Sequence, residues 1–174
     1  LAIGILENLI RTKKLDIANQ TLKEIDYFTL LLLMGLFIVI GGITKAGVVN
    51  DIANLFMKIS GDNLFVIYTL LVWASVLFSA FIDNIPYVMT MLPVAGGIAQ
   101  TMNIEPFILY FGLLIGATLG GNITPIGASA NIAGIGILRK EGHEVSAGQF
   151  MKISVPFTLA AVLTGYLLTW LIWS

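Results

Sequence analysis

The stretch "SAFIDNIPYVMTMLP", residues 79 to 93, places one carboxylate, that of Asp83, inside an apolar sequence. Asp83 is the only Asp, Glu, Lys, Arg or His between Asn63 and Glu105, and none occurs from Pro106 to Leu138. Both windows exceed the roughly 20 apolar residues that a membrane-spanning helix needs. The stretch therefore raises the question of what compensates for a charge at that position, because an unpaired charge in apolar surroundings is costly.

The composition indicates a membrane protein. Of the 174 residues, 57% are hydrophobic and 11% charged, whereas about a quarter are charged in a soluble domain. We therefore predict an all-α, polytopic membrane protein in contact with the lipid bilayer. The net charge of -1 and the absence of Cys give no sign of a nucleic-acid partner, a disulfide or a thiolate metal site.

The hydropathy pattern divides the chain into five parts. They are the end of a helix plus an amphipathic connector (1–26), a scaffold transmembrane helix plus an interfacial helix (27–62), a re-entrant hairpin (63–103), a broken transmembrane helix (104–140), and a loop with the last transmembrane helix (141–174). The first residues lack a Met and a signal-peptide pattern and read as a helix already under way. We therefore expect the chain to be part of a longer membrane protein.

Arm length favours a re-entrant hairpin in the third part. Its second arm, from Tyr87 to about Gln100, would be only ~21 Å long, which is short of the roughly 30 Å hydrocarbon core. Pro86 supports a break before that arm, because proline lacks an N–H and disfavours helix at the preceding residue. The alternative is two complete crossings.

The fourth part must also be interrupted. As one helix, residues 106–138 would measure ~50 Å, too long for one crossing and too short for two with a turn. We place the break in "LGGNITPIGASAN", residues 119–131; the alternative is a loop at the membrane surface. Gly112, Gly116 and Gly120 recur every fourth residue, a pattern that predicts close helix packing.

Two breaks in the bilayer predict an ion site. Unpaired backbone groups cost several kcal/mol there, so such breaks survive only when buried in protein or lining a wet cavity. Discontinuous helices form the sites of many secondary transporters. The candidates are Asp83, Asn84, Asn122, Thr124, Ser129 and Asn131, with a sodium site at the first four of them. A compatible interpretation is that Asp83 caps the second helix of the hairpin.

The basic residues predict the orientation. Six of the nine Lys and Arg residues fall in two connectors, and a seventh, Lys152, follows closely after the second. We therefore expect loops 11–26 and 139–150 to be cytoplasmic and the C-terminus outside, in a prokaryotic inner or plasma membrane. Trp170 and Trp173 are placed as interfacial anchors of the last span.

The first stretch, followed by "GATLGGNITPIGASANI" at residues 116–132, resembles the C-terminal half of the ion transporter superfamily. More narrowly, it resembles the ArsB/NhaD permease group of arsenite permeases, sodium-proton antiporters and the melanosomal P protein. The resemblance implies the second half of an inverted-repeat transporter, a homodimer with elevator-like motion, completed by an N-terminal half. It implies the site residues Asp83, Asn84, Ile85, Pro86, Gly121, Asn122, Thr124, Pro125, Gly127, Ser129 and Asn131.

The expected function is sodium- or proton-coupled transport of a cation, or of an oxyanion or metalloid such as arsenite, with no cofactor beyond the coupling ion. Sodium-dicarboxylate relatives carry a Ser-Asn-Thr motif at both breaks, and this chain departs from it with Asp-Asn-Ile-Pro and Asn-Ile-Thr-Pro. A sodium-coupled citrate-like symporter, a channel and a non-transporting assembly subunit remain alternatives. An enzyme is not expected, because no second acid, His or Cys lies at membrane depth.

Overall fold

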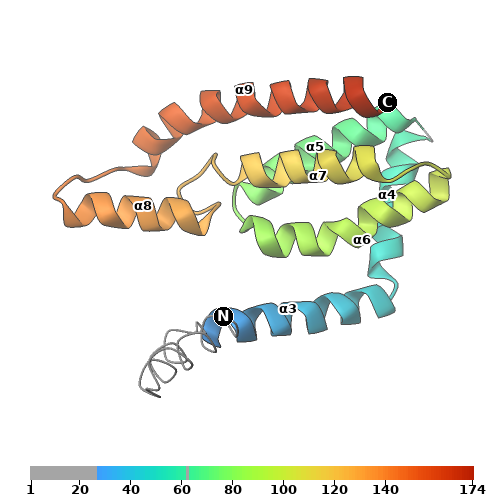
Figure 1. Cartoon of the computed structure of the whole chain (residues 1–174), viewed down its shortest axis with the longest axis horizontal. Helices are drawn as coiled ribbons and strands as arrows, with labels where there is room; N and C mark the ends of the chain where they lie inside the picture. Colours follow the sequence, from blue (N-terminus) through green and yellow to red (C-terminus); the bar gives the residue numbers. More distant parts are fainter. Residues whose placement is uncertain (1–26, 62) are drawn as a thin grey trace, which may run out of the picture. The chain divides into compact units, whose positions relative to one another are not determined.

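The computed structural model describes residues 27–61 and 63–174, and the predictions for residues 1–26 lie outside that part of the chain. The described residues form helices and no strand, which confirms the all-α fold (Figure 1). The helices are α3 (Tyr27–Lys45), α4 (Val48–Ser60), α5 (Leu64–Ser79), α6 (Asn84–Met102), α7 (Phe107–Gly120), α8 (Ser129–Lys140) and α9 (Ala147–Trp173).

The chain divides into two compact units, residues 1–39 and 40–174. In the first unit, the described residues belong to α3 and expose large apolar side chains such as Met34, Phe37 and Ile38. The second unit contains α4 to α9 and every residue of the predicted site.

The core of the second unit is built on the contact between α5 and α7. A Cβ added at Gly116 would lie 2.6 Å from the Ser75 Cβ, and one at Gly120 would lie 2.6 Å from the Val76 carbonyl oxygen. Only glycine permits so close an approach of the two helices. The packing role predicted for the glycine stripe is therefore confirmed.

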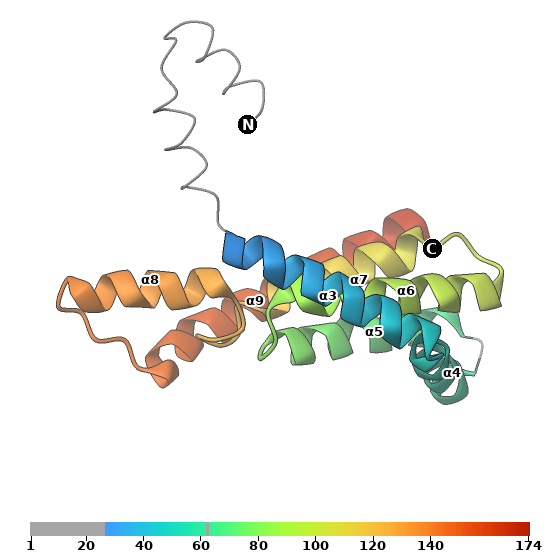
Figure 2. The ribbon, with the colours of Figure 1, turned by 90° about the horizontal axis from the view of Figure 1, so that it is seen from below.

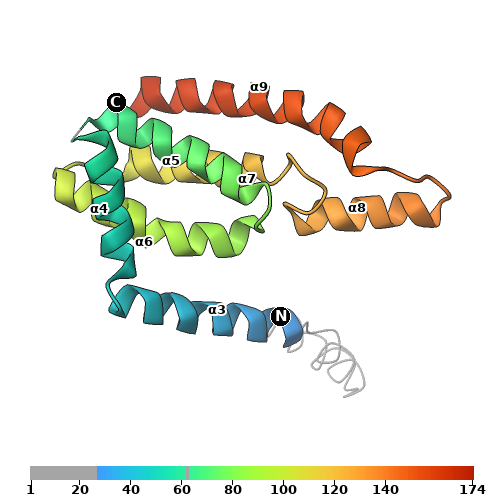
Figure 3. The same ribbon diagram turned by 180° about the vertical axis from the view of Figure 1, so that it is seen from behind.

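The other helices pack around this pair. Helices α6 and α9 both contact α7, and α4 packs across α6 and α5 (Figure 3). Helix α9 runs antiparallel to α7, whereas α8 extends beyond the ends of α5, α6 and α7 (Figures 1 and 2). No residue of α8 is buried, and Ser129 and Asn131 at its N-terminal end form its side-chain hydrogen bonds to the preceding segments.

The bounds of the hairpin's arms differ from the prediction. Helix α6 begins at Asn84 rather than Tyr87 and has 19 residues, or ~28 Å, whereas α5 ends at Ser79. Pro86 does not stop α6, because it lies in the first turn, where backbone N–H groups have no partner within the helix. The arm length predicted for the hairpin is therefore wrong, and length alone does not separate a re-entrant hairpin from two crossings.

Among the described residues, one helix is long and apolar enough to cross a membrane, α9 with 27 residues. The number rises to two if the bent pair Phe37–Lys45 and Val48–Ser60 is counted as one span. Helix α9 starts four residues before the predicted Met151, because Ser146 and Gln149 form a reciprocal capping box.

Candidate functional site

The turn between α5 and α6, residues 80–83, ends at Asp83. This residue is the N-cap of α6, and its Oδ1 accepts a hydrogen bond from the Ile85 N–H at 3.4 Å. Capping places a carboxylate where the first N–H groups of the helix have no partner. The capping interpretation of Asp83 is thus confirmed, and Asn84, Ile85 and Pro86 form the first turn of α6.

Residues 121–128 separate α7 from α8 and are not helical. The Asn131 side chain stabilises this non-helical segment, because its Nδ2 donates to the carbonyl oxygens of Gly121 and Thr124, both at 3.0 Å. From α9, the Ser154 hydroxyl donates to the Ile123 carbonyl oxygen at 2.9 Å. Side chains therefore donate hydrogen bonds to three carbonyl groups of the break, those of Gly121, Ile123 and Thr124.

The turn and the break are in direct contact. Asp83 Oδ2 accepts from the Ser129 hydroxyl at 2.5 Å and from the Ser129 N–H at 3.3 Å. The buried Thr124 hydroxyl donates to the Ala80 carbonyl oxygen. A Cβ at Gly127 would lie 2.7 Å from that same oxygen. We call residues 79–83 together with residues 121–131 the junction.

One carboxylate therefore serves two helices, because Asp83 caps α6 and accepts from the first N–H of α8. A helix N-terminus carries a partial charge of roughly +0.5, so two of them offset about one negative charge. This is what compensates for Asp83: two helix ends and the Ser129 hydroxyl.

The sodium site predicted at Asp83, Asn84, Asn122 and Thr124 stays a prediction. Thr124 is bonded within the protein, and Asn122 lines a cleft beside Asn131. Pro125 borders a separate groove. No cluster of three His, Cys, Asp or Glu side chains occurs among the described residues.

Sequence reasoning missed two residues that position the junction. Ser79 is fully buried and its hydroxyl donates to the Ala117 carbonyl oxygen, which ties the end of α5 to α7. Ser154 ties α9 to the break. A serine in an apolar helix, facing a stripe of glycine, is the signal that could have identified Ser79, because membrane helices pack through such small residues.

Comparison with known proteins places the chain among transporters. Residues 8–116 match the CitMHS family, described as citrate transporter. An uncharacterized transporter of Mycobacterium tuberculosis is 36% identical over 155 residues, which are 88% of this chain and 36% of that protein. An uncharacterized transporter of Synechocystis is 30% identical over 183 residues, covering 95% and 41%. The P protein of Mus musculus is 35% identical over 151 residues, covering 83% and 18%.

No solved structure matches the chain. The chain spans about 36% to 41% of the length of these bacterial relatives. The match nevertheless covers more than half of the chain, and a transporter family implies an integral membrane protein. The chain therefore belongs to the CitMHS citrate transporter family, within the ion transporter superfamily.

Proposed function

We propose that the chain is the C-terminal half of an ion-coupled secondary transporter, in which the junction takes part in binding the transported solute or the coupling ion. The observation that carries this proposal is the Asp83 carboxylate at the meeting point of two helix N-termini. An ionisable residue inside a transmembrane region is by default a functional candidate, and secondary transporters bind their solutes where discontinuous helices meet.

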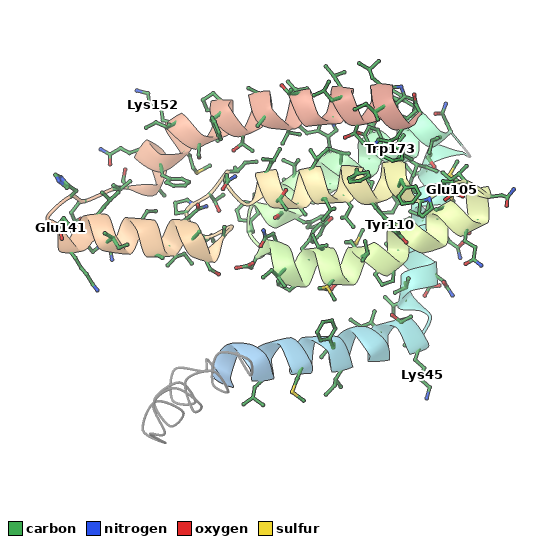
Figure 4. The ribbon with its side chains drawn as sticks, in the orientation of Figure 1. Lys45, Glu105, Tyr110, Glu141, Lys152 and Trp173 are labelled. Atoms are coloured by element: carbon green, nitrogen blue, oxygen red, sulfur yellow. The ribbon has the colours of Figure 1, made fainter. Side chains whose placement is uncertain are left out.

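Helix α9 supports a position of the junction inside the bilayer. Trp173 packs on Phe107 and Phe111, with ring centroids 5.4 and 5.3 Å apart, and lies at the end opposite Lys152 (Figure 4). Ser154, which contacts the break, lies ~10 Å along the helix from its start at Ala147. A core of roughly 30 Å centred on this ~40 Å helix begins ~5 Å from either end. The break would then lie ~5 Å inside the hydrocarbon, which favours a discontinuous helix and a re-entrant hairpin.

The charge at the junction favours a cation or a neutral solute over a carboxylate. Asp83 already occupies the two helix N-termini that would otherwise attract an anion. An anionic solute would face this carboxylate across a low-dielectric site. We therefore favour transport of the ArsB/NhaD kind, of sodium, protons or a neutral metalloid such as arsenite, and the similarity to the P protein agrees with it.

A second candidate is a sodium-coupled symporter of citrate or a similar carboxylate, which the description of the matching family favours. A sodium ion between Asp83 and the substrate would then have to offset their repulsion. In either case we propose that an N-terminal half completes the transport unit and that two copies form a homodimer in the lipid bilayer. We further propose that the connector at 139–150 is cytoplasmic.

Flux measurements on the complete protein in proteoliposomes test the proposal. Sodium, arsenite and citrate uptake would each be followed under imposed sodium or proton gradients. We expect gradient-dependent flux of sodium or arsenite that Asp83→Asn abolishes. Glu105→Gln is the matched control, because Glu105 is exposed at the far end of α6 and α7 (Figure 4). Citrate flux alone would favour the second candidate, and gradient-independent flux of all three solutes would reject both.

A further inference from the structure

A cleft of about 640 Å³ lies between the break, α8 and the N-terminal part of α9. We call it the α8–α9 cleft. Its polar lining residues are Asn122, Asn131, Glu144, Gln149 and Ser154, and its other lining residues, such as Ile153, are apolar. At ~30 Å³ per molecule of liquid water, its volume corresponds to on the order of 20 water molecules, which is room for a hydrated monovalent ion.

Hydrogen bonding fixes the polarity of the cleft's inner end. The Asn131 Nδ2 donates both of its hydrogens to the Gly121 and Thr124 carbonyl oxygens. The side-chain amide therefore has only its acceptor, Oδ1, available to the cleft. The Ser154 hydroxyl donates its hydrogen to the Ile123 carbonyl oxygen, so its Oγ can only accept a further hydrogen bond. Two of the polar groups beside the break are therefore acceptors with no donor to offer.

The outer part of the cleft adds a negative charge. Glu144 lies in the connector and lines the cleft. No Lys, Arg or His is among the lining residues, and Arg139 borders the separate groove with Pro125. The Gln149 side-chain oxygen accepts from the Ser146 N–H at 2.9 Å, so this amide contributes donors near the mouth. Apolar walls such as Ile153 concentrate the field of a single carboxylate.

We propose that the α8–α9 cleft is a water-filled passage through which hydrated monovalent cations reach the break from the side of connector 141–146. The inference rests on the proposed transport function and names the charge class of the solute that this route admits. Glu144, the one charged residue that lines the cleft, favours a cation inside it, and the acceptor oxygens of Asn131 and Ser154 begin to replace water at the break.

Cysteine labelling tests the passage, because these 174 residues contain no Cys. Any cysteine elsewhere in the complete protein would first be replaced. Ile153→Cys places a thiol in the cleft, and Leu163→Cys on the same helix is the matched control, since both native side chains are exposed, at 76% and 46%. Vesicles without a gradient would be treated with the cationic reagent trimethylammonioethyl methanethiosulfonate or the anionic reagent sulfonatoethyl methanethiosulfonate. Labelling needs water at the thiol, and hydrocarbon prevents it.

We expect Ile153→Cys to be labelled and Leu163→Cys to remain unlabelled. After correction for the reagents' rates with a free thiol, the cationic reagent should react at least ~5-fold faster, and Glu144→Gln should reduce that ratio. Sodium should slow the cationic reagent at Ile153→Cys. Val145→Cys serves as a second cleft position if Ile153→Cys does not fold.

Three results would overturn the passage. If neither the cleft thiol nor the control thiol is labelled by the reagents, lipid or another part of the protein fills the cleft. A faster anionic reagent, or a rate ratio indifferent to Glu144→Gln, would remove the cation selectivity. Because labelling is measured without flux, loss of the proposed transport function and loss of the passage are separate outcomes.

Discussion

Gly127→Ala should separate the break from the turn that it packs against. The added Cβ would lie 2.5 Å from the Gly121 carbonyl oxygen, 2.7 Å from that of Ala80 and 2.9 Å from that of Ser79. All three atoms belong to the backbone, so no side chain can rotate away. Gly127 does not have a positive φ, so the substitution tests close approach without backbone strain.

Overpacking of this kind typically costs ~1–3 kcal/mol. For a unit of this size, about 1 kcal/mol corresponds to ~2–4 °C in Tm, so we expect a loss of roughly 2–12 °C. The measurement is the Tm of the complete protein in detergent, together with its flux in proteoliposomes. Flux should fall as well, because the same displacement would pull Ser129 away from Asp83.

Gly134→Ala is the matched control. A Cβ at Gly134 meets no atom within 4 Å, and alanine is the better helix former by ~1 kcal/mol. Its Tm should be unchanged or raised. Equal Tm values for the two variants would refute the close contact between break and turn, and with it the geometry on which the proposed site depends.

Three further substitutions probe the same construction. Asn131→Ala removes the side-chain donor of the Gly121 carbonyl group and leaves the Thr124 carbonyl group with only the Gly127 N–H at 3.4 Å. It should destabilise the protein by ~1–3 kcal/mol, measured as a Tm shift; an unchanged Tm would show that water replaces the amide. Ser129→Ala removes the hydroxyl but keeps the N–H to Asp83, so its loss of Tm should be smaller than that of Asp83→Ala, and the reverse order would contradict the double contact. Gly116→Ala drives a methyl group against Ser75 and should lower expression and Tm, whereas Gly148→Ala, with open space around it, should not.

Helix length predicted the second break, because that prediction needs only the length and the residue types of one continuous segment. Residues 106–138 are too long for one span, and the Gly, Pro and Asn residues of "GGNITP" cannot continue a regular helix at low cost. The glycine stripe likewise predicted a packing face, since its spacing of four residues is a property of one helix.

The start of α6 and the hydrogen bonds that join the turn to the break could not be predicted from local sequence features. Pro86 reads as a stop signal unless the start of α6 is known, because the same residue is tolerated in a first turn. The bond between Asp83 and Ser129 joins residues 46 positions apart, and no periodicity in either helix specifies that register. Ser154 is tied to the break by α9 running beside α7, which is a property of the tertiary packing.

Capping and the proposed ion binding at Asp83 would compete for the same lone pairs. A carboxylate offers about four acceptor positions, and three donor atoms already use them, namely the Ile85 N–H and the two groups of Ser129. A cation at Asp83 must therefore take what remains on Oδ1 or displace Ser129 from Oδ2. In the second case binding would loosen the N-terminal end of α8, where Ser129 bonds to Asp83. The capping of α6 and α8 by Asp83 and the proposed ion binding would then be linked, because occupancy of the proposed ion site would weaken the attachment of α8 to the turn.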